Sequence, residues 1–131
     1  MDESISRALA HSGVIDITTT GRRSGLPRRI EIAYHVIGGR IYISGMPRAD
    51  RKRSWLANLE ADPRFTFHLK GDVRADLPAT ARVITEEPER RVILEHVARA
   101  WKRTDLDFMV AHSPLVEVAI EDPARPVSPA A

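Results

Sequence analysis

Four arginines lie close together in a short segment that otherwise has the composition of a turn, TTTGRRSGLPRR at residues 18–29. Like charges this close repel one another unless water or an anion lies between them. The guanidinium fork matches a phosphate or a carboxylate with paired hydrogen bonds, and Gly21 and Gly25 would let backbone amides approach such a ligand. The segment therefore indicates either an anion site or a solvated basic turn, and both interpretations stay open on these residues alone.

A second basic cluster, Arg51-Lys52-Arg53, follows the loop segment MPRAD at residues 46–50. We expect Asp50 to be the N-cap of a helix whose first turn contains this cluster. Cations at a helix N-terminus oppose the helix dipole by about 0.3–1 kcal/mol each, whereas a bound anion would meet free amides and cations together. Because we expect both basic clusters at the same end of a hairpin, the sequence favours one anion pocket shared by the two.

Tyr34, His35 and Trp55 are side chains near these clusters that could touch a ligand or move a proton. Tyr34 and His35 are neighbours on a predicted strand and so point to opposite faces, which allows at most one of them to line a pocket. Either could protonate an acceptor, and either could equally be an ordinary strand residue. Trp55 is large enough to be core packing or one wall of a ligand site.

Several kinds of site are excluded by what the sequence lacks. It has no cysteine, so disulfides, thiolate catalysis and cysteine-ligated metals are ruled out. Its five histidines are scattered without metal-ligand spacing, so we expect no metal. It contains no dinucleotide-binding glycine fingerprint, P-loop or nucleophile elbow. Aromatic residues make up 5% of the chain and are not interleaved with the basic clusters, so we expect no nucleic-acid partner.

The bulk composition is that of one ordinary globular domain. The chain has 131 residues, of which 43% are hydrophobic and 29% charged, and its formal net charge is +2. The N-terminal segment has no apolar core of signal-peptide length, and no apolar run approaches the length of a membrane span. We therefore expect a cytoplasmic protein without an integral membrane segment. We expect a single domain over residues 1–122 and a disordered Pro/Ala-rich tail at 123–131.

Hydrophobic periodicity predicts strands that alternate with short helices. The predicted helices are 3–12, 51–61 and 86–103, and the predicted strands are 14–20, 28–37, 40–45, 64–70, 72–85 and 115–121. Gly38–Gly39 predicts a tight hairpin turn. The apolar stripe of the longest helix is expected to consist of Val92, Ile93, Val97, Ala100 and Trp101. Hairpins with inserted helices favour a small α+β barrel of about six mostly antiparallel strands over a parallel sheet.

The arginine segment and a second motif together resemble a known family. TTTGRRSGLPRR is followed by WLANLEADPRFTFHLK at residues 55–70, and this pair is similar to the paired motifs of the deazaflavin-dependent nitroreductase and quinone reductase family. The resemblance covers about residues 14–70 closely. It implies a split β-barrel with short flanking helices, related to barrels that bind flavin mononucleotide (FMN). It also implies the coenzyme F420, an 8-hydroxy-5-deazaflavin with a phosphate and an oligoglutamate tail.

The resemblance also assigns residues to the coenzyme. Arg23 and Arg28 match the basic pair that holds its phosphate, and residues 44–55 match the segment that cradles the deazaflavin ring and phosphate. Within that segment the chain departs from the family, because Met46-Pro47 stand where relatives have a glycine-rich loop. The full set of expected coenzyme residues is Gly21, Arg22, Arg23, Ser24, Gly25, Arg28, Ser44, Gly45, Met46, Arg51, Lys52 and Trp55.

The implied activity is hydride transfer from reduced F420 to a small conjugated acceptor, which is a quinone, a nitroaromatic or an enone. The cofactor carries the redox chemistry and the protein orients it, with Tyr34 or His35 as candidate proton donors. Two alternatives stay open. The first is a reductase of the same fold that uses FMN, and the second is a non-catalytic module that binds an anionic flavin-like ligand. By the same resemblance, we expect a homodimer.

Overall fold

Six antiparallel strands close into a barrel in the computed structural model, which describes residues 2–121. Their order around the barrel is β1-β2-β3-β6-β5-β4, so the first and fourth strands close the ring. The strands are β1 (Gly13–Thr20), β2 (Pro27–Ile37), β3 (Arg40–Ser44), β4 (Arg64–Lys70), β5 (Arg74–Val83) and β6 (Leu115–Ile120). The α+β barrel prediction is confirmed, whereas the expected tail at 123–131 lies outside the described residues.

Alternation of side chains fills the interior of the barrel. Ile15 and Ile17 on β1 and Phe67 on β4 are completely buried, whereas Asp16 on β1 and Thr66 on β4, which alternate with them, are partly exposed. On β4, Phe65, Phe67 and Leu69 share one face and all belong to the barrel core. The tight turn is confirmed at Gly38 and Gly39, whose φ angles of 60° and 77° suit glycine.

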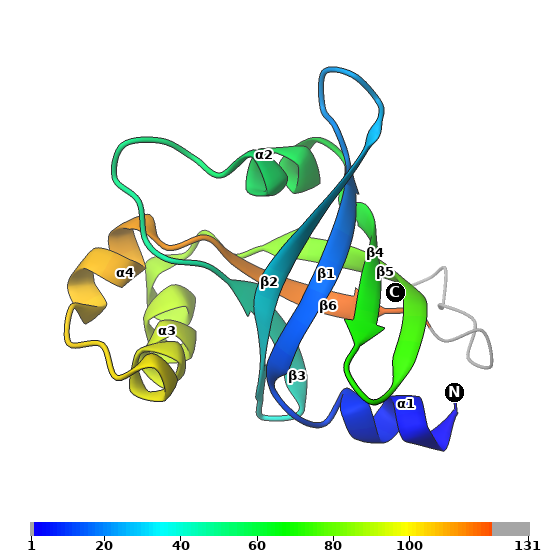
Figure 1. Ribbon diagram of the computed structural model, residues 1–131. Coiled ribbons are helices and arrows are strands. Elements are labelled where there is room, and N and C mark those ends of the chain that lie inside the picture. The colour runs from blue at the N-terminus through cyan, green and yellow to red at the C-terminus, as the bar shows by residue number, and fades with distance from the viewer. Residues whose placement is uncertain (1, 122–131) are drawn as a thin grey trace, which may run out of the picture.

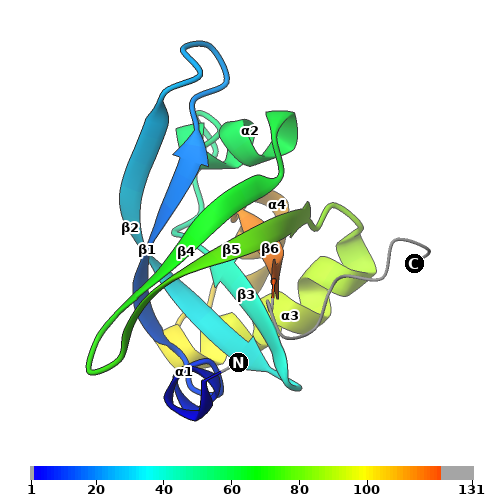
Figure 2. The same ribbon diagram turned by 90° about the vertical axis from the view of Figure 1, so that its right-hand side faces the viewer.

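Within residues 2–121, four helices lie around the barrel, at its two ends and along one side (Figures 1 and 2). They are α1 (Glu3–Ala8), α2 (Ser54–Ala61), α3 (Glu87–Trp101) and α4 (Leu106–His112). α1 lies at one end with the β4–β5 hairpin, and α2 lies at the other end beside the β1–β2 hairpin. α3 and α4 pack together on one side. Helix α4 was not predicted, because its LDFMVAH sequence is only seven residues long.

A second core lies between α3, α4 and the outer face of the barrel. It is formed by Tyr42, Ile84, Ile93, Leu94, Val97, Ala98, Met109, Val110 and Leu115. The predicted stripe of α3 was partly wrong, because Val92 is 63% exposed and Ala100 is also exposed. Leu94 and Ala98 are buried instead. Because α3 packs against α4 as well as the barrel, its buried face is rotated from the predicted one.

The start of α2 differs from the prediction. The helix begins at Ser54, so Arg53 is its N-cap and its side chain makes no capping hydrogen bond. Asp50 lies earlier in the loop, where both of its carboxylate oxygens accept hydrogen bonds from Arg48, at 3.1 and 2.8 Å. Arg48, two residues earlier in the chain, therefore binds the carboxylate that was expected to cap the helix. Arg51 and Lys52 belong to the loop and not to the first helical turn.

No helix within residues 2–121 is long and apolar enough to cross a membrane.

Candidate functional site

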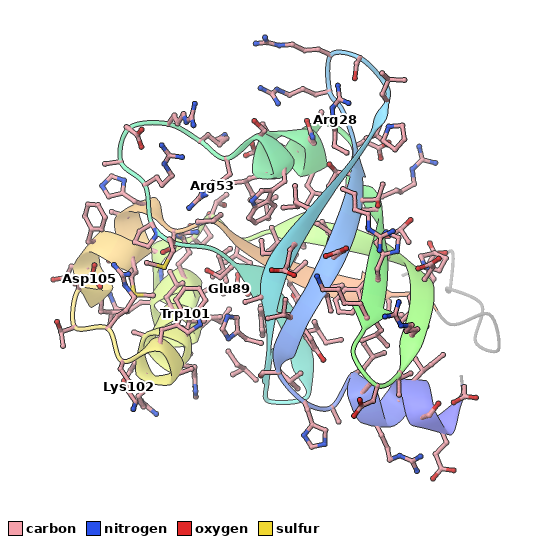
Figure 3. The ribbon with its side chains drawn as sticks, viewed as in Figure 1. Arg28, Arg53, Glu89, Trp101, Lys102 and Asp105 are labelled. Atoms are coloured by element: carbon pink, nitrogen blue, oxygen red, sulfur yellow. The ribbon has the colours of Figure 1, made fainter. Side chains whose placement is uncertain are left out.

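The turn between β1 and β2 and the helix α2 enclose a cavity of about 430 Å³. We call it the arginine-turn pocket. Its lining consists of Thr19, Gly21, Arg22, Arg23, Ser24, Arg28, Arg29, Ile30, Ser54, Trp55 and Asn58. The structure thus brings together six of the residues expected to bind the coenzyme, from two segments that are far apart in the sequence. Arg28 lies beside the turn, next to α2, in Figure 3.

Asn58 holds this turn against α2. Its side-chain amide donates to Thr19 Oγ1 at 3.0 Å, and its carbonyl oxygen accepts from the backbone amide of Arg22 at 3.1 Å and from Arg22 Nη1 at 3.2 Å. Asn58 is only 4% exposed, so these bonds are made away from water. The sequence analysis did not single out Asn58, although the WLANL motif contained it.

Two glycines give the turn its shape. Gly25 has a φ of 71°, in the left-handed region that side chains with a Cβ avoid. A Cβ at Gly21 would lie 2.7 Å from Ser24 Oγ and 3.1 Å from the carbonyl oxygen of Leu26. The turn closes through hydrogen bonds from Gly21 N to Leu26 O and from Gly25 N to Gly21 O, both 2.8 Å long. Both glycines are therefore needed for this backbone, whichever ligand it holds.

The arginines of the turn differ in whether a carboxylate neutralises them. Arg29 Nε is 3.0 Å from Asp16 Oδ2, and hydrogen bonds from Lys70 and Arg29 hold the pKa of Asp16 below its usual range. Within residues 2–121, no carboxylate lies at ion-pair distance from Arg22, Arg23 or Arg28. Arg28 donates only a long bond of 3.4 Å to Ser24 Oγ. Three guanidinium groups are thus available to an anion.

The second basic cluster lies in a different cavity. Arg51 and Lys52 line a space of about 420 Å³ on the other side of α2, together with Arg53. In Figure 3, Arg53 and Arg28 lie on different sides of this helix. The prediction of one shared pocket was wrong, because α2 starts three residues later than expected and stands between the two clusters.

Three further residues that were expected to bind the coenzyme, Ser44, Gly45 and Met46, lie at the end of β3 and just after it. Ser44 Oγ donates to the carbonyl oxygen of Pro114 at 2.8 Å, and a Cβ at Gly45 would lie 3.3 Å from the ring of Pro114. Met46 is half exposed, and its carbonyl oxygen accepts from Arg53 Nη2 at 2.9 Å. None of the three lines the arginine-turn pocket. A Cβ at Gly45 would also lie 3.9 Å from the Trp55 ring, so the backbone of Gly45 passes close to this side chain.

The structure places the two candidate proton donors away from the pocket. Tyr34 is buried near α1, where its hydroxyl donates to the carbonyl oxygen of Ala8 at 3.0 Å and its ring packs edge-on against Phe67. Burial raises the pKa of Tyr34 and lowers that of His35. His35 faces the opposite side of β2, with its ring 5.2 Å from that of Trp101. Neither residue lines the arginine-turn pocket, so the structure does not support either as a proton donor there.

Comparison with known proteins shows the family to which the chain belongs. The model of the F420H(2)-dependent quinone reductase family matches residues 1–110 of the chain. The chain belongs to this family. It is therefore an F420-dependent reductase, and its coenzyme is F420. The resemblance deduced from the two sequence motifs is confirmed.

Solved structures share the fold of this family member at low sequence identity. A conserved hypothetical protein from Mycobacterium tuberculosis is 23% identical over 93% of this chain and 82% of its own, with a TM-score of 0.68. An F420-H2 dependent reductase, FDR-A, is 21% identical over 81% of this chain and 93% of its own, with a TM-score of 0.58. A structure described as a domain-swapped dimer is 20% identical over 89% and 95%, with a TM-score of 0.62.

The arginine-turn pocket fits the anionic part of the family's coenzyme. A phosphate accepts hydrogen bonds from several forked guanidinium donors at once. Three such groups without a carboxylate partner within residues 2–121 surround the turn, and the ring of Trp55, 9% exposed, forms a flat apolar wall. The donor set therefore suits a phosphate attached to a planar ring system.

Proposed function

We propose that this protein reduces a small conjugated acceptor, with a quinone as its preferred class, and that the arginine-turn pocket holds the phosphate of F420. The observation that supports this site is the group of three arginines that have no carboxylate partner within residues 2–121, Arg22, Arg23 and Arg28, held around a rigid turn. The quinone preference follows from the family to which the chain belongs. Nitroaromatic and enone acceptors share the chemistry of accepting a hydride at a conjugated carbon or nitrogen.

The residues of the pocket contribute binding and orientation. When bound, reduced F420 supplies the hydride. Arg23 and Arg28 bind the phosphate, Asn58 keeps the turn against α2, and Trp55 limits how the ligand can lie. Because hydrogen bonds already hold the backbone of the turn in the folded protein, binding has to order only the exposed side chains of Arg23 and Arg28. We assign no side chain as proton donor, since Tyr34 and His35 lie elsewhere.

Replacing both Arg23 and Arg28 by alanine tests the coenzyme site. We expect the affinity for F420 to fall by at least about 100-fold, because two charge-assisted hydrogen-bonding groups are lost. The fold should persist, since both side chains are exposed and neither makes an ion pair within residues 2–121. Fluorescence titration with oxidised F420 measures the affinity, and thermal unfolding checks the fold.

Arg74→Ala is the matched control for this double variant. Arg74 is also an exposed arginine, but it starts β5 and does not line the arginine-turn pocket. The Arg74→Ala variant should bind F420 with the affinity of the parent protein. Unchanged F420 affinity in the double variant would show that the phosphate binds elsewhere.

A parallel titration with FMN addresses the alternative coenzyme, and turnover of a quinone panel with reduced F420 addresses the non-catalytic alternative. Binding of F420 together with quinone reduction supports the proposal. Binding without turnover of any quinone, nitroaromatic or enone would instead favour a binding module.

We also propose that the protein forms a homodimer. One structural relative is described as a domain-swapped dimer, and it covers 89% of this chain. Light scattering on the purified protein at several concentrations measures the assembly, and a mass of one chain throughout would contradict this proposal.

A further inference from the structure

Three polar side chains form a hydrogen-bonded chain on the outer face of the barrel. They are Thr18 on β1, His68 on β4 and Asp76 on β5, three neighbouring strands (Figure 2). Each is next in sequence to a residue of the barrel core, so strand alternation turns all three outward. None of the three lines the arginine-turn pocket. We call this group the threonine triad.

The hydrogen bonds of the threonine triad fix the roles of its members. His68 Nδ1 donates to Asp76 Oδ1 at 2.7 Å, because an ionised carboxylate can only accept. In the neutral imidazole this leaves Nε2 as the acceptor. His68 Nε2 lies 2.7 Å from Thr18 Oγ1, so the hydroxyl donates to it. A hydroxyl, a histidine base and a carboxylate that orients the base form the arrangement that activates a hydroxyl nucleophile.

Burial and charge hold the base in this orientation. His68 is only 7% exposed and bonds to a strand on each side, so its ring is fixed. The hydrogen bond from His68 and, less strongly, the charges of His68 and Arg29 hold the pKa of Asp76 below its usual range. Asp76 is therefore an ionised acceptor at neutral pH. The sequence contains no nucleophile elbow, but a triad is defined by geometry and not by sequence position.

The hydroxyl of the triad is accessible to a small substrate. Thr18 is partly exposed, and it lines a cavity of about 360 Å³ together with Thr66 and Arg64. Arg29, which also lines the arginine-turn pocket, is the cross-strand partner of Thr18 on β2. Arg29 bonds to Asp16 on the outer face, so its cation lies on the same side of the sheet as the Thr18 hydroxyl. A cation there stabilises negative charge on a carbonyl oxygen under attack.

We propose that the threonine triad is a second active site, which hydrolyses small carboxylic esters that have a good leaving group. Thr18 Oγ1 attacks the carbonyl carbon while its proton passes to His68 Nε2. The bond to the leaving alcohol breaks, the alcohol takes that proton, and the acyl group stays on Thr18 as an ester. Water then gives a proton to His68 and attacks this ester, which releases the carboxylic acid as Thr18 regains the proton. Asp76 is a positioning residue, because it acts through His68.

The first test is hydrolysis of p-nitrophenyl acetate by the full chain without F420. We expect release of p-nitrophenolate and, after an acid quench, an acetyl group on Thr18 in peptide mass spectrometry. Thr18→Val and His68→Gln should each lower the rate at least about tenfold and abolish this acetyl group, because the nucleophile or its base is lost. Thr18→Ser keeps a hydroxyl and should still be acetylated at position 18, which tests the nucleophile even if the valine variant does not fold.

Variants of Asp76 separate positioning from a structural role. In Asp76→Asn the amide nitrogen of the new side chain cannot accept from Nδ1, which favours the wrong histidine tautomer, so we expect a rate at least about tenfold lower. Asp76→Glu keeps a carboxylate and should recover most of the rate. A carboxylate with only a structural role would lower the melting temperature and leave the hydrolysis rate per folded molecule unchanged, and this result would overturn the role of Asp76.

Matched controls account for reaction of the ester with ordinary surface groups. Thr80→Val removes another partly exposed threonine, on β5, and His96→Gln removes an exposed histidine on α3. Neither residue belongs to the triad, so both variants should keep the parent rate and the acetyl group on Thr18.

Three results would overturn the proposal of a second active site. They are the absence of an acetyl group on Thr18, an equal loss of rate in the control variants, and unchanged acetylation of Thr18 in His68→Gln. Because the assay contains no F420, its outcome does not depend on the coenzyme site, which the F420 titration tests separately.

Discussion

At the scale of single residues, Asn58 makes the hydrogen bonds that hold the arginine turn against α2. It is the buried link between α2 and the turn, with bonds to Thr19 and Arg22. The arginines of the turn were predicted as ligand-binding residues because a cluster of charges stands out in the sequence. A single amide inside a helix carries no such signal until the fold shows that it faces the turn.

We expect Asn58→Ala to destabilise the protein by about 1–3 kcal/mol, because the variant leaves the buried hydroxyl of Thr19 without its donor and the Arg22 amide without its acceptor. Urea denaturation measures this loss. F420 affinity should also fall, since the turn is no longer held in place.

The double variant Asn58→Ala/Thr19→Val supplies the control. Removing both partners should cost less than the sum of the single variants, which a double-mutant cycle detects. Additive effects would mean that the Asn58–Thr19 bond contributes nothing to stability.

At the scale of elements, the turn at residues 21–26 depends on a backbone that few residue types adopt. Gly25 has a φ of 71°, and a Cβ added there would meet no atom within 4 Å, so a substitution is strained by conformation and not by crowding. We expect Gly25→Ala to cost about 1–2 kcal/mol in the free energy of unfolding. It should also weaken F420 binding, because Arg23 and Arg28 flank the altered backbone.

Gly71→Ala is the matched comparison. Gly71 also has open space around it, but its φ lies outside the left-handed region. Stability and F420 affinity should stay within about 0.5 kcal/mol of the parent values. Equal losses in the two variants, measured by urea denaturation and coenzyme titration, would show that conformational strain at Gly25 is not the cause.

At the scale of the whole molecule, His35 lies where the barrel meets its helical side. It is 6% exposed, its Nε2 atom has no hydrogen-bond partner within residues 2–121, and its ring packs edge-on against Trp101 of α3. Burial disfavours the charged imidazolium, which is why the pKa of His35 falls below its usual value. Packing of α3 on the barrel therefore favours the neutral form of His35.

This arrangement predicts a pH-dependent stability. The pKa of His35 is about 6.5 in the unfolded chain and lower in the folded one, so the unfolded chain takes up a proton first as the pH falls. The contribution of His35 is fully present above about pH 6.5 and is lost as the pH falls below that value. His35→Phe keeps a ring against Trp101 but cannot titrate.

The measurement is urea denaturation of both proteins between about pH 5 and pH 8. The difference in stability between parent and variant should change below about pH 6.5 and be constant above it. A difference that does not vary with pH across this range would rule out protonation of His35 as a destabilising step.

The amino-acid sequence alone was enough to predict the barrel, the family and its coenzyme, whereas it left open whether the arginine turn binds an anion. These predictions came from local patterns, which can be recognised without knowing the tertiary contacts. The patterns are the alternation in 64–70, the Gly38–Gly39 turn and the paired motifs at 18–29 and 55–70. They were sufficient for the fold class and for the family and its coenzyme, which the family match confirms.

Only the tertiary structure decided which residues share a cavity. Helix α2 begins at Ser54, and Asp50 binds Arg48 instead of capping the helix. The two basic clusters line separate cavities on either side of α2. The same long-range packing rotates α3 toward Leu94 and Ala98 and takes Tyr34 and His35 away from the pocket. These outcomes depend on contacts between segments distant in the chain, whose free energies no local pattern contains.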